Sequence, residues 1–260
     1  MREWLKIQFD HVFDTLSVPD EWKMGKLNPL MKSCTGHPGD PTNRRPIMLM
    51  QNVLKIFNSI LAERLQDVIE KEKLVGPEQF GFVRGRRIET PIAEAIGALE
   101  DAKISSTPIF MAGLDIAKAY DTVDFQALEA GLKDMNLGRR FIQYIRELYR
   151  NRKATILTGY GETKPFKIER GISQGDPLSC LLFVIFMERI LKEIRGKFQG
   201  YQYKFVNHKV CALAFADDIL IITENKEELQ EICSRLVTKI REAGMEVNFK
   251  KVGLFNECER

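Results

Sequence analysis

The chain has 260 residues, of which 44% are hydrophobic and 29% are charged, and its formal net charge is +3. This composition is typical of a globular protein long enough to bury a sizeable core, and it excludes fibrous and intrinsically disordered classes. The net charge is too small to indicate nucleic-acid binding by itself, so the local distribution of charge matters more.

The cysteines are scattered and form no C-x-x-C pair, which argues against a zinc site and against a disulfide framework. The N-terminal segment is charged and amphipathic, without the apolar centre of a signal peptide. No apolar run approaches the roughly 20 residues that span a bilayer. We therefore expect an intracellular protein of a reducing compartment, nuclear or cytoplasmic, with no membrane partner.

Apolar residues recur at helical spacing in several segments. These predicted helices lie near residues 1–18, 51–72, 89–103, 124–136, 138–151, 179–196 and 226–243. Pro19 ends the first helix, and Gly244 is expected to cap the last one. Asp121 and Asp124 are expected to cap the helix that follows them, and Asp176 is expected to start a helix rather than bind metal.

Runs of β-branched and apolar residues predict strands between the helices. These strands lie near residues 26–50, 108–114, 154–157, 164–168, 211–215, 219–223 and 246–256, the last as a short strand pair. Helices that flank a small, mostly antiparallel sheet predict an α+β fold. The turn-rich segments at 35–41 and 81–87 precede the sheet, so we expect them to form a separate lobe.

Phe215-Ala216-Asp217-Asp218 places two adjacent carboxylates between apolar runs, a pattern that predicts a strand, a tight turn and a second strand. Asp115 ends another apolar run. Burying such acids costs several kcal/mol unless a positive charge neutralises them, and hard carboxylate oxygens suit Mg²⁺ or Mn²⁺. Two strands that each end in acid predict a two-metal site for phosphoryl transfer. The alternative is a surface turn with solvated acids.

Six motifs in order resemble the reverse transcriptases of non-LTR (LINE-type) retrotransposons, with group II intron enzymes as more distant relatives. They read NRRPI (43–47), QFGFVRGR (79–86), LDIAKAYD (114–121), GISQGDPLS (171–179), FADD (215–218) and GMEVNFKK (244–251). Each motif alone is unspecific, whereas six in the family's order over most of the chain are specific. Phe215 favours the LINE-type branch, because retroviral and group II enzymes more often carry tyrosine there.

The resemblance implies a right-hand polymerase fold with fingers and an antiparallel palm sheet. Residues 1–106 would form an N-terminal extension and fingers, and residues 107–260 the palm, with interleaving of the two near 138–170. The sequence departs from the family at Val83-Arg84, where many relatives have Arg-Pro, and at Val252, where Thr or Ser is common. The chain stops soon after the last motif, so we expect the thumb to be absent and the chain to be part of a larger polyprotein.

The function implied is an RNA-directed DNA polymerase that adds deoxynucleoside triphosphates (dNTPs) to a DNA primer on an RNA template, using two Mg²⁺ or Mn²⁺ ions. An inactive or fragmentary reverse-transcriptase-like module that binds nucleic acid is the alternative. A polymerase with relaxed template choice, or one that makes RNA, is a further alternative; Tyr120 argues against the synthesis of RNA.

The resemblance also assigns residues. The catalytic acids would be Asp115, Asp217 and Asp218, which with the carbonyl of Ile116 would be the metal ligands. The nucleotide-binding residues would be Lys32, Arg45, Tyr120, Gln174, Gly175 and Lys251. The template-binding residues would be Phe82, Arg84 and Arg86.

Each of these roles has a plainer alternative. Lys32 and Arg45 suit triphosphate oxygens, but isolated surface charges are usually solvated, and Arg44 is an alternative to Arg45. Tyr120 would exclude a ribose 2′-hydroxyl sterically, or else is a packed core tyrosine. A side chain larger than Gly175 would block the approach of the backbone to substrate, or else the glycine only forms a turn.

Overall fold

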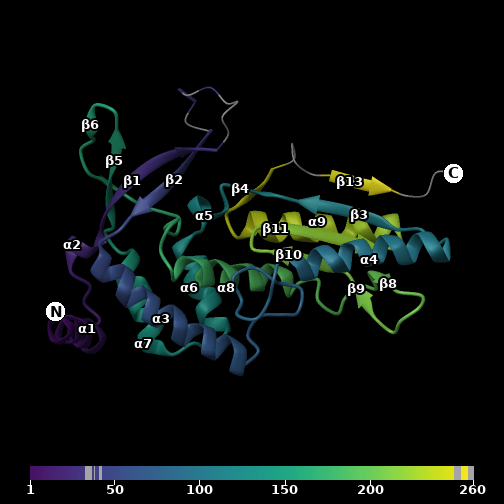
Figure 1. Ribbon diagram of the computed structural model, residues 1–260, viewed down its shortest axis with the longest axis horizontal. Helices are drawn as coiled ribbons and strands as arrows, with labels where there is room; N and C mark the ends of the chain where they lie inside the picture. Colours follow the sequence, from purple (N-terminus) through teal and green to yellow (C-terminus); the bar gives the residue numbers. More distant parts are fainter. Residues whose placement is uncertain (33–36, 38, 41–42, 249–252, 257–260) are drawn as a thin grey trace. The chain divides into compact units, whose positions relative to one another are not determined.

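The structure is a computed structural model that describes residues 1–32, 37, 39–40, 43–248 and 253–256, the last segment as backbone only. The chain, drawn as a ribbon in Figure 1, has two compact units, each made of two separate stretches of sequence. Unit 1 comprises Met1–Leu65 and Asp124–Leu182, and unit 2 comprises Gln66–Val123 and Phe183–Arg260. The chain passes from one unit to the other within α3 (Asn52–Lys71), after Leu65, and again within α8 (Ser179–Leu191), after Leu182. The predicted division into an N-terminal extension with fingers (residues 1–106) and a palm (residues 107–260) stays a prediction.

In its described residues, unit 1 contains the first parts of α3 and α8 together with α1 (Arg2–Thr15), α2 (Asp20–Lys23), α6 (Phe125–Asp134) and α7 (Arg139–Tyr149). The predicted apolar face of α3 is buried through Leu54, Phe57 and Leu61. The ring of Phe57 packs on Phe9 and Tyr144, with centroid distances of 5.1 and 5.3 Å. The period of 3.6 residues thus places one stripe of α3 against α1 and α7.

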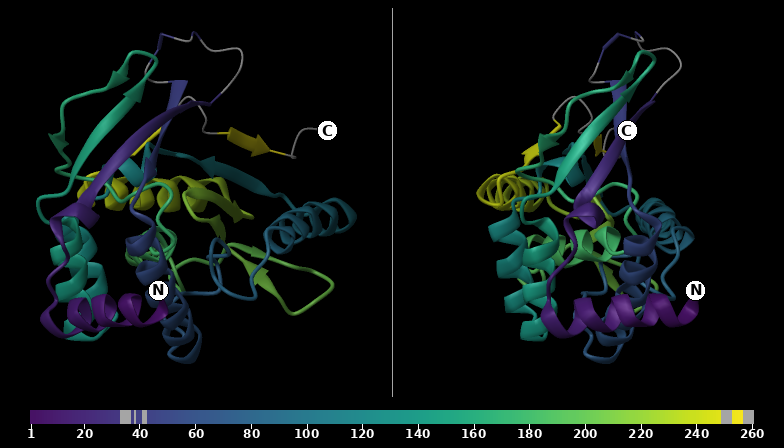
Figure 2. Two further views of the ribbon diagram at one scale, coloured as in Figure 1. Left: turned by 60° about the vertical axis from the view of Figure 1, so that its left-hand side comes forward. Right: turned by 90° about the vertical axis from the view of Figure 1, so that its left-hand side faces the viewer.

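The sheet of unit 1 joins strands from distant parts of the chain (Figure 2). Its strands are β1 (Met24–Met31), β2 (Arg44–Leu49), β5 (Lys153–Thr158), β6 (Gly161–Glu162) and β7 (Phe166–Lys167). β1 pairs antiparallel with β2 and parallel with β5. The predicted hairpin is present, because β5 pairs antiparallel with β7.

The main sheet of unit 2 is antiparallel throughout, in the order β10-β11-β3-β13. These strands are β3 (Phe110–Leu114), β10 (Ala212–Phe215), β11 (Asp218–Thr223) and β13 (Gly253–Asn256). Helix α4 (Glu89–Ser105) packs against β10, and α9 (Lys226–Glu242) packs against β11 and β3. Met111, Leu213 and Ile222 of the sheet share a buried cluster with Ala98 of α4. The predicted α+β class is confirmed.

The predicted strand pair near residues 246–256 is wrong in its pairing. β12 (Glu246–Val247) pairs with β4 (Ile116–Ala117), whereas β13 pairs with β3. The remaining short elements of unit 2 are α5 (Ala119–Thr122), β8 (Tyr201–Gln202) and β9 (Lys209–Val210). Among the helices in the described part of the chain, none is both long enough and apolar enough to cross a bilayer.

Two predicted helix ends are confirmed. The carboxylate of Asp124 accepts hydrogen bonds from the backbone N–H groups of Gln126 and Ala127, each at 2.9 Å, and so caps α6. Asp121 does not cap α6; it lies within α5. Gly244 follows the end of α9 with a φ of 79°, the left-handed conformation in which glycine commonly ends a helix.

Candidate active site

The hairpin of β10 and β11 carries the adjacent acids. Phe215 pairs with Asp218 across the hairpin, so Ala216 and Asp217 form its two-residue turn. Ala216 has a φ of 58°, which is unusual for a residue with a β-carbon. The strands on both sides are largely buried. Asp217 is therefore presented at the end of a rigid element rather than on a long loop.

The third acid reaches the same edge of the sheet. β3 is antiparallel to β11, and their last pair is Leu114 with Ile219. Asp115 directly follows β3 at the end of the sheet where Asp218 begins β11, so the acids lie at the same end of these two paired strands. Asn248, which the sequence analysis did not single out, fixes Asp115: its backbone N–H and Nδ2 donate to the carbonyl and Oδ2 of Asp115, at 2.8 and 3.0 Å.

The carboxylates at this end of the sheet suit a hard divalent cation. Within the described ranges, no group of three or more His, Cys, Asp or Glu side chains is arranged to hold a metal ion. Mg²⁺, however, is usually held by only one or two carboxylates together with water and substrate phosphates. Asp115 and Asp217 on one sheet edge fit that type of site, and the more exposed Asp218 does not complete a three-carboxylate cage.

Tyr120 lies in α5, and its ring stacks on Phe183 with a centroid distance of 4.8 Å and an interplanar angle of 12°. The residue is half-buried, so one face of the ring is packed. This contact restricts the ring orientation, which both the packed-tyrosine and the steric-gate interpretations require.

Gln174 and Gly175 lie in unit 1, in the loop before α8. The carbonyl of Gln174 accepts a hydrogen bond from the backbone N–H of Met48 at 2.8 Å. Gly175 has a φ of 112°, and a β-carbon there would lie 3.0 Å from the Met48 carbonyl oxygen. The close approach of the loop to β2 is therefore one reason for the glycine, in addition to the predicted role.

Replacing Gly175 by alanine is expected to destabilise the protein by about 2 kcal/mol or more, because the backbone conformation is strained for an L residue and the added methyl meets a carbonyl. Urea unfolding measures this loss. Gly159→Ala is the matched control, because a β-carbon at Gly159 meets nothing within 4 Å. Equal unfolding midpoints for the two variants would contradict the expectation.

Asp176 is confirmed as a helix-start residue, since it accepts a hydrogen bond from the backbone N–H of Leu178 at 3.1 Å. It also belongs to a buried polar network that the sequence did not predict. Asn58 Nδ2 donates to both carboxylate oxygens at 2.9 Å, and Tyr144 Oη donates to Asn58 Oδ1 at 2.5 Å. Burial raises the pKa of Asp176. Asn58 sits on the apolar face of α3, so periodicity alone assigns it to the core without revealing its partner.

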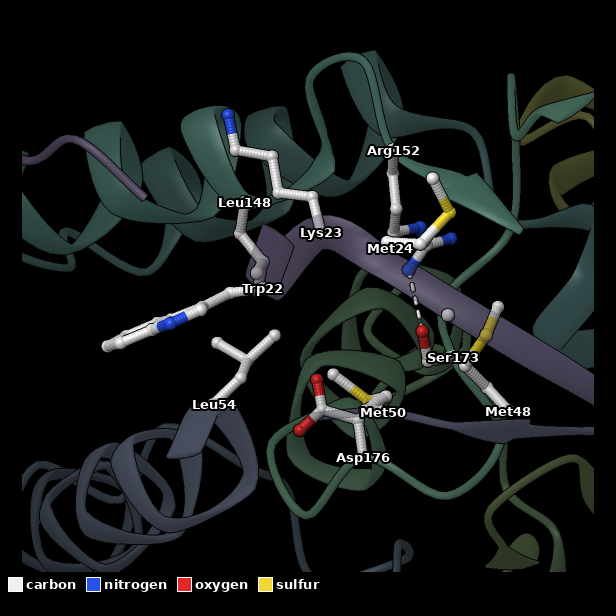
Figure 3. Close-up of a pocket in the computed structure, with 11 residues that line it drawn as sticks. Trp22, Lys23, Met24, Met48, Met50, Leu54, Leu148, Arg152, Ser173 and Asp176 are labelled. Carbon is white, nitrogen blue, oxygen red and sulfur yellow. Dashed lines mark hydrogen bonds between the residues drawn. The ribbon is translucent and has the colours of Figure 1, made fainter. Parts of the chain in front are cut away.

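Figure 3 shows Asp176 beside Arg152 and Ser173 in a small pocket of unit 1. Arg152 donates to Ser173 Oγ at 2.7 Å and to the Gly171 carbonyl at 2.9 Å. The pocket has a volume of about 10 Å³, room for about one water molecule. This pocket is too small for a substrate. The hydrogen bonds of Arg152 and Asp176 hold the 171–178 loop in place.

The proposed template residues lie in unit 2 and are engaged within the protein. Arg84 donates to Asp67 at 2.6 Å and lies 3.7 Å from Glu70. The guanidinium of Arg86 donates to the carbonyls of Val75, Gly76 and Gln79. The Arg86 guanidinium therefore organises its own segment, whatever else it contacts.

The ring of Phe82 is partly exposed and lies 6.2 Å from that of Phe215, between ring centroids. The third proposed template residue thus lies beside the hairpin that carries the acids.

The proposed triphosphate residues lie in unit 1. The backbone N–H of Lys32 donates to the Asn43 carbonyl at 2.8 Å, which continues the pairing of β1 with β2 by one residue. Arg45 is exposed on β2, whereas Arg44 donates to the Pro29 carbonyl at 3.0 Å. Arg45 is thus the better placed of the two arginines for a solvent-borne ligand. Lys251 lies outside the described residues.

Comparison with known proteins agrees with the resemblance found in the sequence motifs. The family model described as reverse transcriptase (RNA-dependent DNA polymerase) matches residues 33–259. A Pol polyprotein from the type-1 retrotransposable element R2 of Nasonia vitripennis is 28% identical over 212 residues, which cover 82% of this chain and 20% of the relative. An R2 polyprotein of Popillia japonica is 29% identical over 240 residues, covering 90% and 32%. The chain thus spans a third or less of these relatives.

Solved structures support the fold alone. Apo telomerase from Candida tropicalis superposes with a TM-score of 0.67 at 13% identity, covering 99% of this chain and 50% of the telomerase chain. The same telomerase with a fragment of telomeric RNA gives a TM-score of 0.64 at 12% identity, covering 98% and 45%.

Proposed function

Because this chain belongs to the reverse transcriptase (RNA-dependent DNA polymerase) family, we propose that it is an RNA-directed DNA polymerase core of the non-LTR retrotransposon type. It would extend a DNA primer along an RNA template by adding nucleotides from dNTPs, as part of a larger polyprotein. The observation that carries the proposal is the convergence of Asp115 and the Asp217-Asp218 turn on one edge of an antiparallel sheet. In this reading the sheet of unit 2 is the palm, and the β1–β2 hairpin belongs to the fingers.

The acids would perform the metal-binding part of the reaction. Asp115 and Asp217 would be the principal ligands, with the carbonyl of Ile116 and the side chain of Asp218 as accessory ligands. When bound, two Mg²⁺ or Mn²⁺ ions activate the primer 3′-hydroxyl and stabilise the charge that develops on the departing pyrophosphate. Asn248 holds one oxygen of Asp115, which orients that carboxylate before substrate binds.

Basic and polar side chains would bind the remaining parts of the substrates. Lys32 and Arg45 would contact the triphosphate, and Gln174 the nucleotide or template. Lys251 would donate a proton to the pyrophosphate. Phe82 would stack on a template base and Arg84 would contact a template phosphate, with Arg86 holding their loop.

Replacing Tyr120 by alanine is expected to let the polymerase incorporate ribonucleotides, because removing the ring opens space for a 2′-hydroxyl. The measurement is the ratio of kcat/KM for a dNTP to that for the matching ribonucleotide, expected to fall at least about tenfold. Tyr120→Phe keeps the ring and its stacking on Phe183, so its ratio should stay near that of wild type. An unchanged ratio in Tyr120→Ala would leave Tyr120 as a packed core residue.

Primer extension tests the proposed function itself. A labelled DNA primer annealed to an RNA template should lengthen only when template, dNTPs and a divalent cation are all present. The second candidate is a module that binds nucleic acid without polymerising, the alternative that the sequence left open. Retention of the RNA–DNA duplex in a gel-shift assay without any extension would support that candidate and contradict the polymerase.

A further inference from the structure

Within the segment 75–81 of unit 2, residues 78–80 lie beside β10. The backbone N–H of Phe80 donates to the Ala214 carbonyl, and the N–H of Ala214 donates to the Glu78 carbonyl, both at 2.7 Å. Gln79 and Ala214 form a parallel bridge. This segment therefore runs directly beside the strand that leads into the turn carrying Asp217.

The side chain of Gln79 binds the turn itself. It is fully buried, and its Oε1 accepts hydrogen bonds from the N–H of Ala216 at 2.8 Å and of Gly81 at 2.9 Å. Its Nε2 donates to the Ala216 carbonyl at 3.3 Å. One amide group thus satisfies both backbone polar groups of Ala216, the left-handed residue immediately before Asp217. Since a residue with a β-carbon disfavours that conformation, something must hold it there.

The segment that presents Gln79 is itself tied down from several directions. Arg86 donates to the carbonyls of Val75, Gly76 and Gln79. The carboxylate of Glu188 accepts the N–H of Gly76 at 3.0 Å.

Arg195 adds an ionic connection to the same segment. Its guanidinium lies 2.6 Å from both Glu78 and Glu188, and the pKa of Arg195 is raised by these two carboxylates despite its burial. Two arginines and two glutamates therefore hold the backbone from which Gln79 extends.

Close packing leaves little freedom on the other side of Gln79. A β-carbon at Gly81 would lie 2.4 Å from the backbone nitrogen of Ala216. The absence of a side chain at Gly81 allows the segment to approach the turn, and the approach brings the Gln79 amide within reach of Ala216. Gly81 and Gln79 thus act as one unit, the former providing the space and the latter the hydrogen bonds.

We propose that Gln79 is a positioning residue for the polymerase reaction, which holds the Ala216-Asp217 turn in the conformation that presents Asp217 as a metal ligand. The inference rests on the proposed function. It adds a residue that contacts neither substrate nor metal and acts through the backbone of Ala216. Loss of the amide is expected to leave substrate binding intact while the turn moves, and small displacements of a reacting group cost large factors in rate.

The test combines kinetics with hydrogen exchange. Gln79→Ala is expected to lower kcat for primer extension by about 10- to 100-fold, with the KM for dNTP and the affinity for the RNA–DNA duplex near wild type. Hydrogen exchange at the amide of Ala216 should become at least about tenfold faster, because its acceptor is gone, while the amide of Ile221 within β11 stays unchanged.

Two further variants separate positioning from general stability. Gln79→Glu keeps an oxygen that can accept from the N–H groups of Ala216 and Gly81, and as a neutral carboxyl group it also keeps a donor for the Ala216 carbonyl. Its kcat should therefore recover well above that of the alanine variant, most clearly at mildly acidic pH, where a buried carboxyl group is neutral. Tyr201→Phe removes another buried hydrogen bond of unit 2, from Tyr201 Oη to Asp101 at 2.6 Å, and should lower stability without lowering kcat. If Gln79→Ala does not fold, the glutamate variant still decides: a loss as severe as that of Asp217→Asn would overturn the inference.

The outcomes distinguish this inference from the proposed function. A kcat of Gln79→Ala within about twofold of wild type, or unchanged exchange at Ala216, overturns the inference and leaves the polymerase standing. A wild-type chain that extends no primer contradicts the polymerase. In that event the exchange rate still reports whether Gln79 holds the turn, because that measurement requires no activity.

Discussion

Replacing Asp217 by asparagine is expected to lower the rate of primer extension to about 1% of the wild-type rate or less. A neutral amide is a poor ligand for a hard divalent cation, and the stabilisation supplied by such an ion amounts to several kcal/mol of the barrier. Since each 1.36 kcal/mol is a factor of ten, a loss of roughly 3 kcal/mol already gives about 100-fold. The measurement is single-turnover extension on an RNA template with Mg²⁺.

The same aspartate-to-asparagine change at Asp124 provides a matched control. Asp124 caps α6, and asparagine is an equally good cap, so extension should stay within about twofold of wild type. Asp217→Asn should not lower the melting temperature, because it removes one of two adjacent like charges. Equal extension by wild type and Asp217→Asn would remove the proposed role of Asp217 as a metal ligand.

Replacing Asn58 by alanine is expected to lower the free energy of unfolding by about 3 kcal/mol. The change removes both hydrogen bonds that Asn58 donates to the buried Asp176 carboxylate and the acceptor of Tyr144. Removing a partner from a buried charge costs about 3–5 kcal/mol and from a neutral group about 1–3 kcal/mol, with partial relaxation reducing the sum. Urea unfolding followed by circular dichroism measures the change.

The neighbouring Ser59→Ala is the control within the same helix. Ser59 is exposed and its hydroxyl donates to the carbonyl of Lys55 within the same helix, so its removal should change stability by no more than about 0.5 kcal/mol. Equal effects of the two substitutions would show that the network around Asp176 contributes nothing to stability.

The effect of Asn58→Ala should depend on pH in a stated direction. Burial raises the pKa of Asp176, so the folded state binds a proton more readily than the unfolded state. Stability from this group therefore falls as pH rises from the ordinary aspartate range through the raised value. Losing two donors raises that pKa further, because they favour the charged form. The destabilisation should thus be larger at neutral than at mildly acidic pH, and the opposite trend would contradict the assignment.

The features that could be predicted from the sequence are those set by residues close together in the chain. The apolar stripes of α3 and α9 follow from spacing within each helix, and the cap at Asp124 follows from its side chain and the N–H groups two and three positions later. The β10–β11 hairpin was equally local, since apolar runs flank Asp217 on both sides. The reverse transcriptase family was recognisable because its motifs retain their order.

Pairings between distant segments could not be predicted in the same way. The parallel register of Met24 with Lys153 joins β1 to β5 without any local signal. The last strands were expected to pair with each other, but β12 and β13 pair with β4 and β3 instead. Hydrophobic pattern identifies a strand, but its partner depends on which edge the rest of the chain leaves open.

By itself, the amino-acid sequence determined that this chain is an α+β protein of the reverse transcriptase family, with acids at the ends of apolar strands. Only the tertiary structure decided which groups hold those acids in place. Asn248 and Gln79 lie within motifs, but nothing in the sequence pairs Asn248 with Asp115 or Gln79 with Ala216. The reason is that a hydrogen bond requires two groups at about 3 Å, and for residues far apart in the chain that distance is set by packing rather than by composition.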